Sequence, residues 1–302
     1  MMDEAAPTVS VVIPAYNASR FIAATLDSVH AQTYTDYEVI VVDDGSADDT
    51  GDVVEAYFAH RRMRGRCVRQ QNKKIAGARN TGMRAARGPY IALLDHDDLW
   101  YPPKLSKVMQ AFAEHPEVDL VGHHINVTRD GTILRMERKG PAVPRMYERL
   151  LLIGNALSPS AVVVRKDKVL AIGGFREAPE FNTVEDYDFW MRLSLTSRFH
   201  FLDEALAEYP LVATSASSNV DYHFTNLETL LREHFLSHFG PTPGLVARLK
   251  MRRRMGSVYR AAAGAAAGER QAYYVRKMLA AYPFAIKNIG RAAQWLLRRA
   301  WK

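Results

Sequence analysis

One stretch of the 302-residue sequence decides the fold class: Gly-Pro-Tyr-Ile-Ala-Leu-Leu-Asp-His-Asp-Asp, residues 88–98. Its apolar part, residues 90–94, indicates a buried strand, and three carboxylates follow within four residues. Like charges so close repel one another unless a cation or solvent offsets them. Open α/β sheets bind ligands at the carboxyl ends of their strands, so this stretch predicts such a sheet with a binding edge.

The preceding residues repeat this organisation. A second β-branched run stops at Asp43-Asp44-Gly45-Ser46, which places a second acidic turn at the same predicted edge. Strands that alternate with helices at this spacing predict βαβ units and a parallel sheet. The expected strands span residues 9–13, 38–42 and 66–70, and the expected helices span 18–32, 48–59 and 75–86.

The pattern changes after residue 120. A hairpin is expected over residues 125–134, turning at Asp130-Gly131, with a strand at 161–164, a helix at 185–195 and mainly helices after 224. From residue 245 to 302 the chain holds 14 Lys and Arg residues and one acid, Glu269. This change to a strongly basic composition follows Pro241-Thr242-Pro243-Gly244, a stretch typical of a domain boundary. We therefore expect a catalytic domain over 1–240 and a basic helical extension over 241–302.

The composition is that of an ordinary globular protein, with 48% hydrophobic and 24% charged residues. A single cysteine, Cys67, excludes an internal disulfide, and no Cys/His cluster has the spacing of a zinc site. The acidic start lacks an apolar leader, and no window approaches the ~18 apolar residues of a membrane span. These features predict a cytoplasmic protein.

Three acidic segments are candidates for chemistry. Mg²⁺ and Mn²⁺ prefer oxygen ligands, so Asp95 to Asp98 suits a cation that bridges substrate phosphates. The alternative for this segment is a solvated turn before a helix. Asp44 has two interpretations: it accepts hydrogen bonds from a nucleotide, or it caps the helix that follows. Glu185 or Asp186 is either a general base or an acid that stabilises the first turn of a helix through the helix dipole. Taken singly, Asp44 and the pair Glu185-Asp186 fit the structural alternative better.

Six segments in order resemble the family 2 glycosyltransferases, and the resemblance covers roughly residues 8–215. It implies a GT-A fold, a Rossmann-like mixed α/β sheet flanked by helices. It also implies an inverting transfer of a sugar from a nucleotide-diphospho-sugar, a UDP-sugar by default, to an acceptor hydroxyl in cell-surface polysaccharide or glycolipid synthesis. The segments are residues 9–17, 41–46, 77–82, 88–100, 172–175 and 185–188.

The resemblance assigns a role to each matching residue, and the assigned cation is Mn²⁺ or Mg²⁺. Asp186 is the expected catalytic base, and Asp97 with Asp95 is expected to hold the cation. The residues expected to bind the donor are Pro14, Ala15, Tyr16, Asp44, Lys74, Arg79, Asp95, His96 and Asp97.

One segment departs from the family pattern. Many members carry Tyr-Arg-x-His after the base, and the histidine completes the metal shell, whereas this chain has Tyr209-Pro210-Leu211-Val212. The third protein ligand is therefore open. His223 is a nearby candidate, and a surface or core histidine is the alternative interpretation.

Residues 284–302 form an amphipathic pattern with Lys287 and Arg291 on one stripe and Ile286 and Ile289 elsewhere. Basic residues with tryptophan on such a helix favour an anionic membrane surface near a lipid-linked acceptor. Packing of the apolar face on the protein or on another subunit explains the pattern equally well.

Other function classes fit less well. A sugar-nucleotide nucleotidyltransferase usually has a Gly-rich basic loop after its first strand, where this chain has Pro14-Ala15-Tyr16-Asn17. The basic extension permits nonspecific phosphate binding, but no nucleic-acid-binding module accompanies it. A non-catalytic binder of nucleotide-sugars is the third alternative, and the presence of Asp97 and Asp186 argues against it.

Overall fold

The structure, a computed structural model, describes residues 5–211 and 220–300, without the side chains of residues 293 and 296–300. The chain divides into two compact units. The first comprises Met1–Tyr147, Ala156–Glu177 and Glu185–Thr214, and the second comprises Glu148–Asn155, Ala178–Val184 and Ser215–Lys302. The boundary expected after residue 240 stays a prediction.

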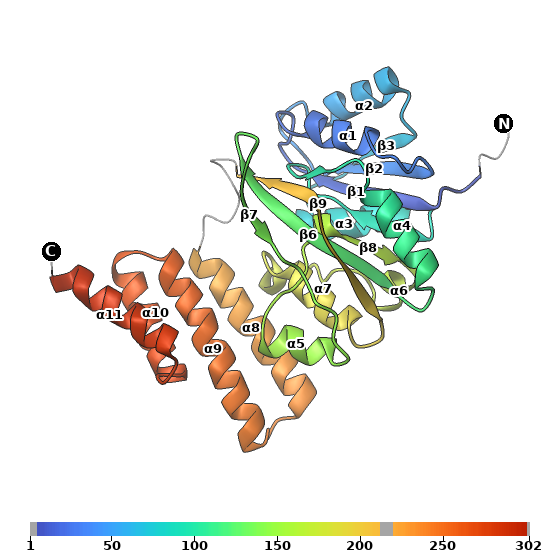
Figure 1. The fold of residues 1–302 in the computed structure, drawn as a ribbon. Helices are drawn as coiled ribbons and strands as arrows, with labels where there is room; N and C mark the ends of the chain where they lie inside the picture. The colour runs from blue at the N-terminus through green and yellow to red at the C-terminus, as the bar shows by residue number, and fades with distance from the viewer. Residues whose placement is uncertain (1–4, 212–219, 301–302) are drawn as a thin grey trace. The chain divides into compact units, whose positions relative to one another are not determined.

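A mixed sheet forms the centre of the first unit (Figure 1). Its order is β3 (Gly65–Arg69), β2 (Tyr37–Asp43), β1 (Val9–Ala15), β4 (Tyr90–Leu93), β8 (Val162–Arg165), β6 (Leu120–Arg129), β9 (Phe199–Pro210) and β5 (Leu99–Trp100), with β7 (Thr132–Glu137) paired to β6. The strands β3, β2, β1 and β4 are parallel, as their β-branched runs and intervening helices predict.

Helices cover both faces of these parallel strands. On one face α1 (Ile22–His30), α2 (Thr50–Arg61) and α4 (Lys104–Glu114) pack on alternate strand residues such as Val11 and Val39. On the other face α3 (Lys74–Ala85) lies against β1 and β2, and a Cβ added at Gly82 lies only 2.4 Å from Val12 Cγ1. Glycine thus permits the close approach of α3 to the sheet.

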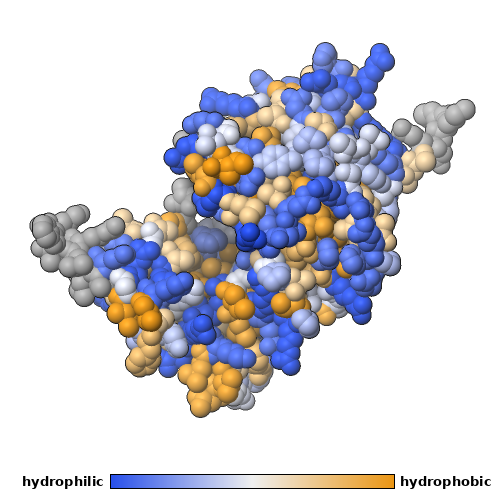
Figure 2. Space-filling model, viewed as in Figure 1, coloured by the Kyte–Doolittle hydropathy of each residue, from blue (hydrophilic) through white to orange (hydrophobic). Residues whose placement is uncertain are grey.

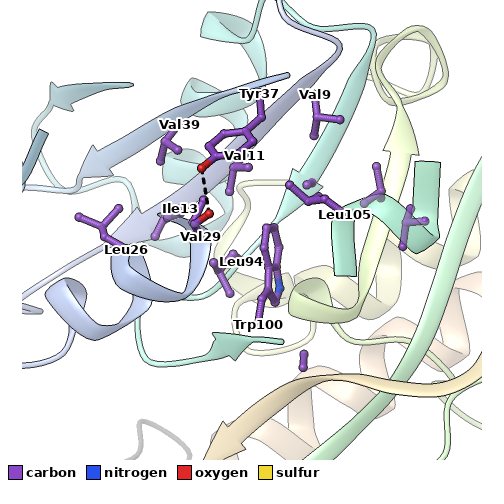
Figure 3. Packing of buried hydrophobic residues seen from close by; sticks show 14 of the residues in the cluster. Val9, Val11, Ile13, Leu26, Val29, Tyr37, Val39, Leu94, Trp100 and Leu105 are labelled. Atoms are coloured by element: carbon purple, nitrogen blue, oxygen red, sulfur yellow. Dashed lines mark hydrogen bonds between the residues drawn. The ribbon is translucent and has the colours of Figure 1, made fainter. Parts of the chain in front are cut away.

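Trp100 joins the acidic segment to this core. Its side chain is 3% exposed and lies beside Leu94 and Leu105 in Figure 3. The Lys104 ammonium nitrogen lies 3.4 Å from the centroid of the Trp100 ring, and burial lowers the pKa of Lys104 well below its usual value. The residues that follow the carboxylates are therefore fixed by apolar packing.

The second half of the sheet is not parallel. Strand β8 runs antiparallel to both β4 and β6, so the start of β8 lies at the sheet edge where β4 ends. The predicted hairpin is confirmed as β6–β7, and its turn residues Asp130 and Gly131 have φ angles of 50° and 74°. Helices α6 (Lys166–Ala171) and α7 (Glu185–Leu193) complete this unit.

The second unit is helical over its described residues after position 220, as the sequence predicts. It contains α8 (Val220–Phe239), α9 (Leu245–Ala265), α10 (Gly268–Ala281) and α11 (Ile286–Ala300); α5 (Met146–Leu152) joins it to the first unit. None of the helices, over the part of the chain that is described, is both long and apolar enough to cross a membrane.

Candidate active site

The acidic turn after β4 is held by side chains of α1. Thr25 Oγ1 donates to the backbone oxygens of His96 and Asp98, over 2.7 and 3.0 Å. Ser28 Oγ accepts the backbone N–H of Trp100 over 3.1 Å. These bonds fix the backbone of the turn, so its carboxylates have a defined position.

Ser160, which the sequence did not single out, contacts both ends of this turn. Its hydroxyl accepts the backbone N–H of Asp95 over 3.1 Å and donates to Asp98 Oδ2. Its carbonyl accepts the indole N–H of Trp100 over 2.8 Å. Because Ser160 precedes the antiparallel β8, only the sheet topology brings it to this edge.

The second acidic turn lies at the same edge of the sheet. Asp44 is 3% exposed, and its Oδ1 accepts from Gln70 Nε2 over 2.7 Å and from the Lys73 backbone over 2.8 Å. Its own N–H donates to Ala15, at the end of β1. A buried carboxylate with one oxygen left for a further donor suits a base N–H or a ribose hydroxyl.

The loop after β1 joins the two acidic turns. His96 Nδ1 lies 3.2 Å from the carbonyl oxygen of Pro14, and Asn17 bonds to Ser46 and Ala47 beyond the β2 turn. Tyr16 is 49% exposed. The structure therefore brings together Pro14, Ala15, Asp44 and His96, four of the predicted donor-binding residues, with Tyr16 in the connecting loop.

Arg79 joins the acidic turn to α7. Its side chain is 2% exposed, with Nη2 2.8 Å from Asp95 Oδ1 and Nη1 2.9 Å from Glu185 Oε1. Its guanidinium carbon lies 5.3 Å from the centroid of the Phe175 ring. Despite burial, the carboxylates of Asp95 and Glu185 raise the pKa of Arg79, so it stays charged. We therefore infer a positioning role for Arg79 beside its predicted contact with the donor.

Asp186, the predicted base, lies in the first turn of α7 and is half-buried. Its neighbour Glu185 is buried, and burial together with the Asp186 charge raises the pKa of Glu185 to about 7, against the opposing effect of Arg79. The two adjacent carboxyl groups therefore lie in different environments, with Glu185 buried against Arg79 and Asp186 half-buried.

Buried polar contacts fix the start of α7. Asp188 is fully buried; its Oδ1 accepts from Arg176, and its Oδ2 accepts from Arg192 Nε over 2.7 Å. Arg192 also donates to the carbonyl oxygens of Ile172 and Gly174. This enclosure by two arginines favours a structural role for Asp188, the third acid in the first turn of α7.

Asn80, next to Arg79, holds the adjacent segment. Its side chain exchanges two hydrogen bonds with the Phe175 backbone, each of 2.8 Å. Lys74 lies at the start of the same helix and is exposed, and no contact of its ammonium with a described residue places it beside Arg79. Its predicted donor role therefore stays a prediction.

The acidic turn fits a hard cation in its donor atoms. Burial and the Asp95 charge raise the pKa of both Asp97 and Asp98, and no described residue donates a hydrogen bond to the buried Asp98 Oδ1. The oxygen-only donor set matches the preference of Mg²⁺ and Mn²⁺. Among the described residues, however, no group of three or more His, Cys, Asp or Glu side chains forms a metal site. The chain therefore offers part of the coordination shell of a cation, and the phosphate oxygens of the donor and water molecules would supply the other ligands.

The residues around the expected third ligand differ in placement. Tyr209 lies near the end of β9, and burial followed by the charges of Asp97, Asp98 and Asp95 raises its pKa. This segment therefore faces the acidic turn, as the resemblance implies. Val212 lies outside the described residues, and His223 lies on α8 in the second unit, with Nδ1 3.2 Å from Thr183 Oγ1.

Glu185 supplies a pH-dependent prediction. Between pH 4.5 and about 7 the folded state keeps a proton on Glu185 that the unfolded chain has released. The stability of the wild type relative to Glu185→Gln should therefore fall as the pH rises through this window, by at most about 1.4 kcal/mol per pH unit. Urea unfolding at several pH values measures it. Glu55→Gln, at a site 59% exposed, is the control, and parallel profiles for the two variants would contradict the assignment.

Comparison with known proteins places this geometry in a family. The family model described as glycosyl transferase family 2 matches residues 10–166. The putative teichuronic acid biosynthesis glycosyltransferase TuaG of Bacillus subtilis is 32% identical over 216 residues, which cover 70% of this chain and 82% of TuaG. For four further curated relatives the match covers 28% to 66% of the relative, so the chain spans about half their length.

Solved structures share the fold. S. aureus TarS 1–349 in complex with UDP-GlcNAc superposes with a TM-score of 0.64 at 19% identity, covering 97% of this chain and 92% of that one. Mannosyltransferase PcManGT from Pyrobaculum calidifontis, in complex with GDP-Man and Mn²⁺, gives 0.57 at 18% identity, covering 97% and 88%. The GT-A fold expected from the sequence is confirmed, and the chain belongs to glycosyl transferase family 2.

Proposed function

We propose that this chain transfers a sugar from a nucleotide-diphospho-sugar to an acceptor hydroxyl, with inversion at the anomeric carbon. The observation that carries the proposal is the buried contact of Arg79 with Asp95 and Glu185. This contact joins a strand end suited to a diphosphate to the helix that carries Asp186.

The nucleotide end of the donor is assigned to the loops after β1 and β2. Asp44 keeps Oδ2 for a base N–H or ribose hydroxyl, because Gln70 and Lys73 both donate to Oδ1. A UDP-sugar is the default donor, by the resemblance and by the UDP-GlcNAc bound to TarS. Tyr16 is exposed enough to cover a base.

Asp97, with Asp95, is proposed to hold Mn²⁺ or Mg²⁺ against the diphosphate. When bound, the cation offsets the charge that develops on the departing nucleoside diphosphate. The Mn²⁺ in the PcManGT complex supports this choice of metal. Arg79 binds the other side of Asp95 and keeps that carboxylate oriented.

Asp186 is proposed to take the proton of the acceptor hydroxyl as its oxygen attacks the anomeric carbon opposite the leaving diphosphate. One displacement of this kind inverts the configuration, so a covalent glycosyl-enzyme is not needed. Glu185, buried beside Asp186, is withdrawn into its ion pair with Arg79. The exposure of Asp186 leaves it as the carboxylate of this pair that an acceptor can reach.

The acceptor is proposed to be a saccharide or a lipid-linked saccharide in polysaccharide or glycolipid synthesis. The names of two relatives support this class: TuaG in teichuronic acid biosynthesis and AmsB of Erwinia amylovora in amylovoran biosynthesis.

The base assignment is tested with Asp186→Asn. This change removes the proton acceptor and keeps the shape, so turnover should fall by roughly 10²-fold or more while donor affinity is retained. Initial rates of nucleoside diphosphate release and donor calorimetry provide the two readouts. Asp167→Asn, another acid in the first turn of a helix, is the matched control. Near-normal turnover in Asp186→Asn would move the base role to another residue.

The metal assignment is tested with Asp97→Ala. Donor affinity measured by calorimetry with Mn²⁺ should fall about tenfold or more, since one carboxylate ligand is lost. With EDTA the wild type should bind the donor as weakly as the variant does with Mn²⁺. Asp167→Ala serves as the control, and unchanged Mn²⁺-dependent affinity in Asp97→Ala would contradict the role.

We also propose that α11 lies on an anionic membrane surface near a lipid-linked acceptor. Three apolar side chains at its start are exposed: Phe284 (83%), Ile286 (85%) and Ile289 (54%). Lys287 is exposed among them, and the helices of this unit carry an excess of basic residues. Exposed apolar groups with neighbouring cations match the chemistry of an anionic bilayer surface.

Flotation with phosphatidylglycerol vesicles tests the membrane proposal. Replacing Phe284, Ile286 and Ile289 with serine should reduce the floating fraction several-fold, because less apolar surface inserts. The matched control replaces Leu245, Val246 and Leu249 of α9, exposed by 64%, 66% and 48%. Equal losses in both triple variants, or no flotation of the wild type, would count against a specific role of α11.

A further inference from the structure

A second charged pocket lies in the first unit, apart from the acidic turns. It has a volume of about 380 Å³, and its lining includes the four arginines Arg62, Arg64, Arg66 and Arg87 together with the single acid Glu38. Four guanidinium groups against one carboxylate leave an excess of positive charge around one hollow. Like charges held this close repel one another, so an anion in the pocket would stabilise it.

Glu38 forms a buried anchor of this pocket. Its side chain is 1% exposed and accepts from Ser10 Oγ and the Arg87 backbone, both over 2.7 Å. Arg66 Nη1 and Arg87 Nε contact its other oxygen at 3.0 and 3.1 Å. Burial alone would raise the pKa of Glu38, but these hydrogen bonds and Arg66 lower it, so the carboxylate stays ionised and orients two guanidinium groups.

Two of the arginines keep donors for a ligand. Arg62 is exposed; its backbone N–H donates to the Phe58 carbonyl, but its guanidinium makes no hydrogen bond or ion pair with any described residue. Arg87 is 44% exposed and binds Glu38 through Nε; within the described part of the chain, its two terminal nitrogens have no acceptor. Arg66 is 39% exposed, and its second terminal nitrogen, Nη2, donates a hydrogen bond to the Ala85 carbonyl. The guanidinium N–H groups left for a ligand therefore belong mainly to Arg62 and Arg87, and the single charge of Glu38 is shared between Arg66 and Arg87.

The donor diphosphate does not account for this pocket. Glu38 is the second residue of β2, Arg66 is the second residue of β3, and Arg87 lies three residues before β4. The pocket thus lies at strand starts, whereas the acidic turns follow the ends of β2 and β4. A seven-residue strand is about 20 Å long, so the two sites lie on opposite edges of the sheet. Figure 2 shows mainly hydrophilic side chains over α2 and the segment that leads from it into β3.

We propose that this arginine pocket binds a phosphate group, as inorganic phosphate, a phosphate ester or the headgroup of an anionic lipid. A phosphate carries a charge of about −1.5 to −2 and three acceptor oxygens, which match several guanidinium forks at once. The planar fork of arginine suits this bidentate contact better than lysine does. The pocket is separate from the proposed donor site. The proposal of phosphate binding therefore does not depend on the proposed sugar transfer.

Calorimetric titration of the full chain with inorganic phosphate, at constant ionic strength set with chloride, tests the proposal. The double variant Arg62→Gln/Arg87→Gln removes the two guanidinium groups that keep N–H donors for a ligand, and its phosphate affinity should fall about tenfold or more. The control Arg129→Gln/Arg135→Gln removes the same charge from the β6–β7 hairpin. Both variants leave the proposed donor site at the acidic turns unchanged, so phosphate bound there contributes equally to the heat measured for each variant.

Arg62→Gln alone guards against misfolding of the double variant, because the Arg62 guanidinium has no partner among the described residues and the substitution keeps the backbone N–H that bonds to Phe58. Its phosphate affinity should fall by several-fold with an unchanged thermal midpoint. A second arm compares flotation on phosphatidylcholine vesicles with and without phosphatidic acid. If the double variant loses flotation on the vesicles with phosphatidic acid selectively, the ligand is a lipid headgroup. If the double variant loses only the calorimetric binding signal for inorganic phosphate, the ligand is a soluble phosphate. Absence of saturable phosphate binding by the wild type in both arms, or equal losses in the variant and the control, would overturn the proposal.

Discussion

The rest of the active site depends on one buried cation. Arg79 is almost inaccessible to water, and an uncompensated charge in that position would cost several kcal/mol. It is therefore stable only while Asp95 and Glu185 are both in contact with it. Because these carboxylates lie 90 residues apart in the sequence, the ion pairs require the end of β4 and the start of α7 to stay together.

The surrounding polar groups make this arrangement rigid. Asn80 holds the Phe175 backbone, and Arg192 joins Asp188 to the glycine turn before Phe175. On the other side Ser160 holds both ends of the acidic turn. Buried hydrogen-bond networks that are satisfied in this way favour one geometry, which suits the alignment of donor, cation and base that we propose.

Local pattern predicted the parallel half of the sheet well, because β-branched runs and acidic stops are short-range signals. It predicted α1 from residue 18, whereas the helix begins at Ile22. The backbone N–H groups of Ala18 and Ser19 bond instead to the side chains of Thr50, at the start of α2, and Asp48, just before it, which the sequence does not reveal.

The same limit explains what was missed at the sites. Ser160 follows a segment without periodicity, and its role arises only from the antiparallel direction of β8. Arg79 was expected to bind the donor, and its motif says nothing about Glu185, 106 residues away. The arginine pocket combines Glu38, Arg62 and Arg87 from separate strand starts, so it becomes visible only once the sheet is assembled.

The reversal of β8 has an evolutionary consequence. The reactive edge receives strand ends from the first hundred residues and a strand start from the segment before β8. The loops after β1 and β2 and the later segments thus enter it from separate parts of the chain, joined mainly through Arg79, Asn80 and Ser160. Substitutions in the later segments that keep these junctions leave the loops after β1 and β2 in place, so the two parts of this edge are free to diverge separately.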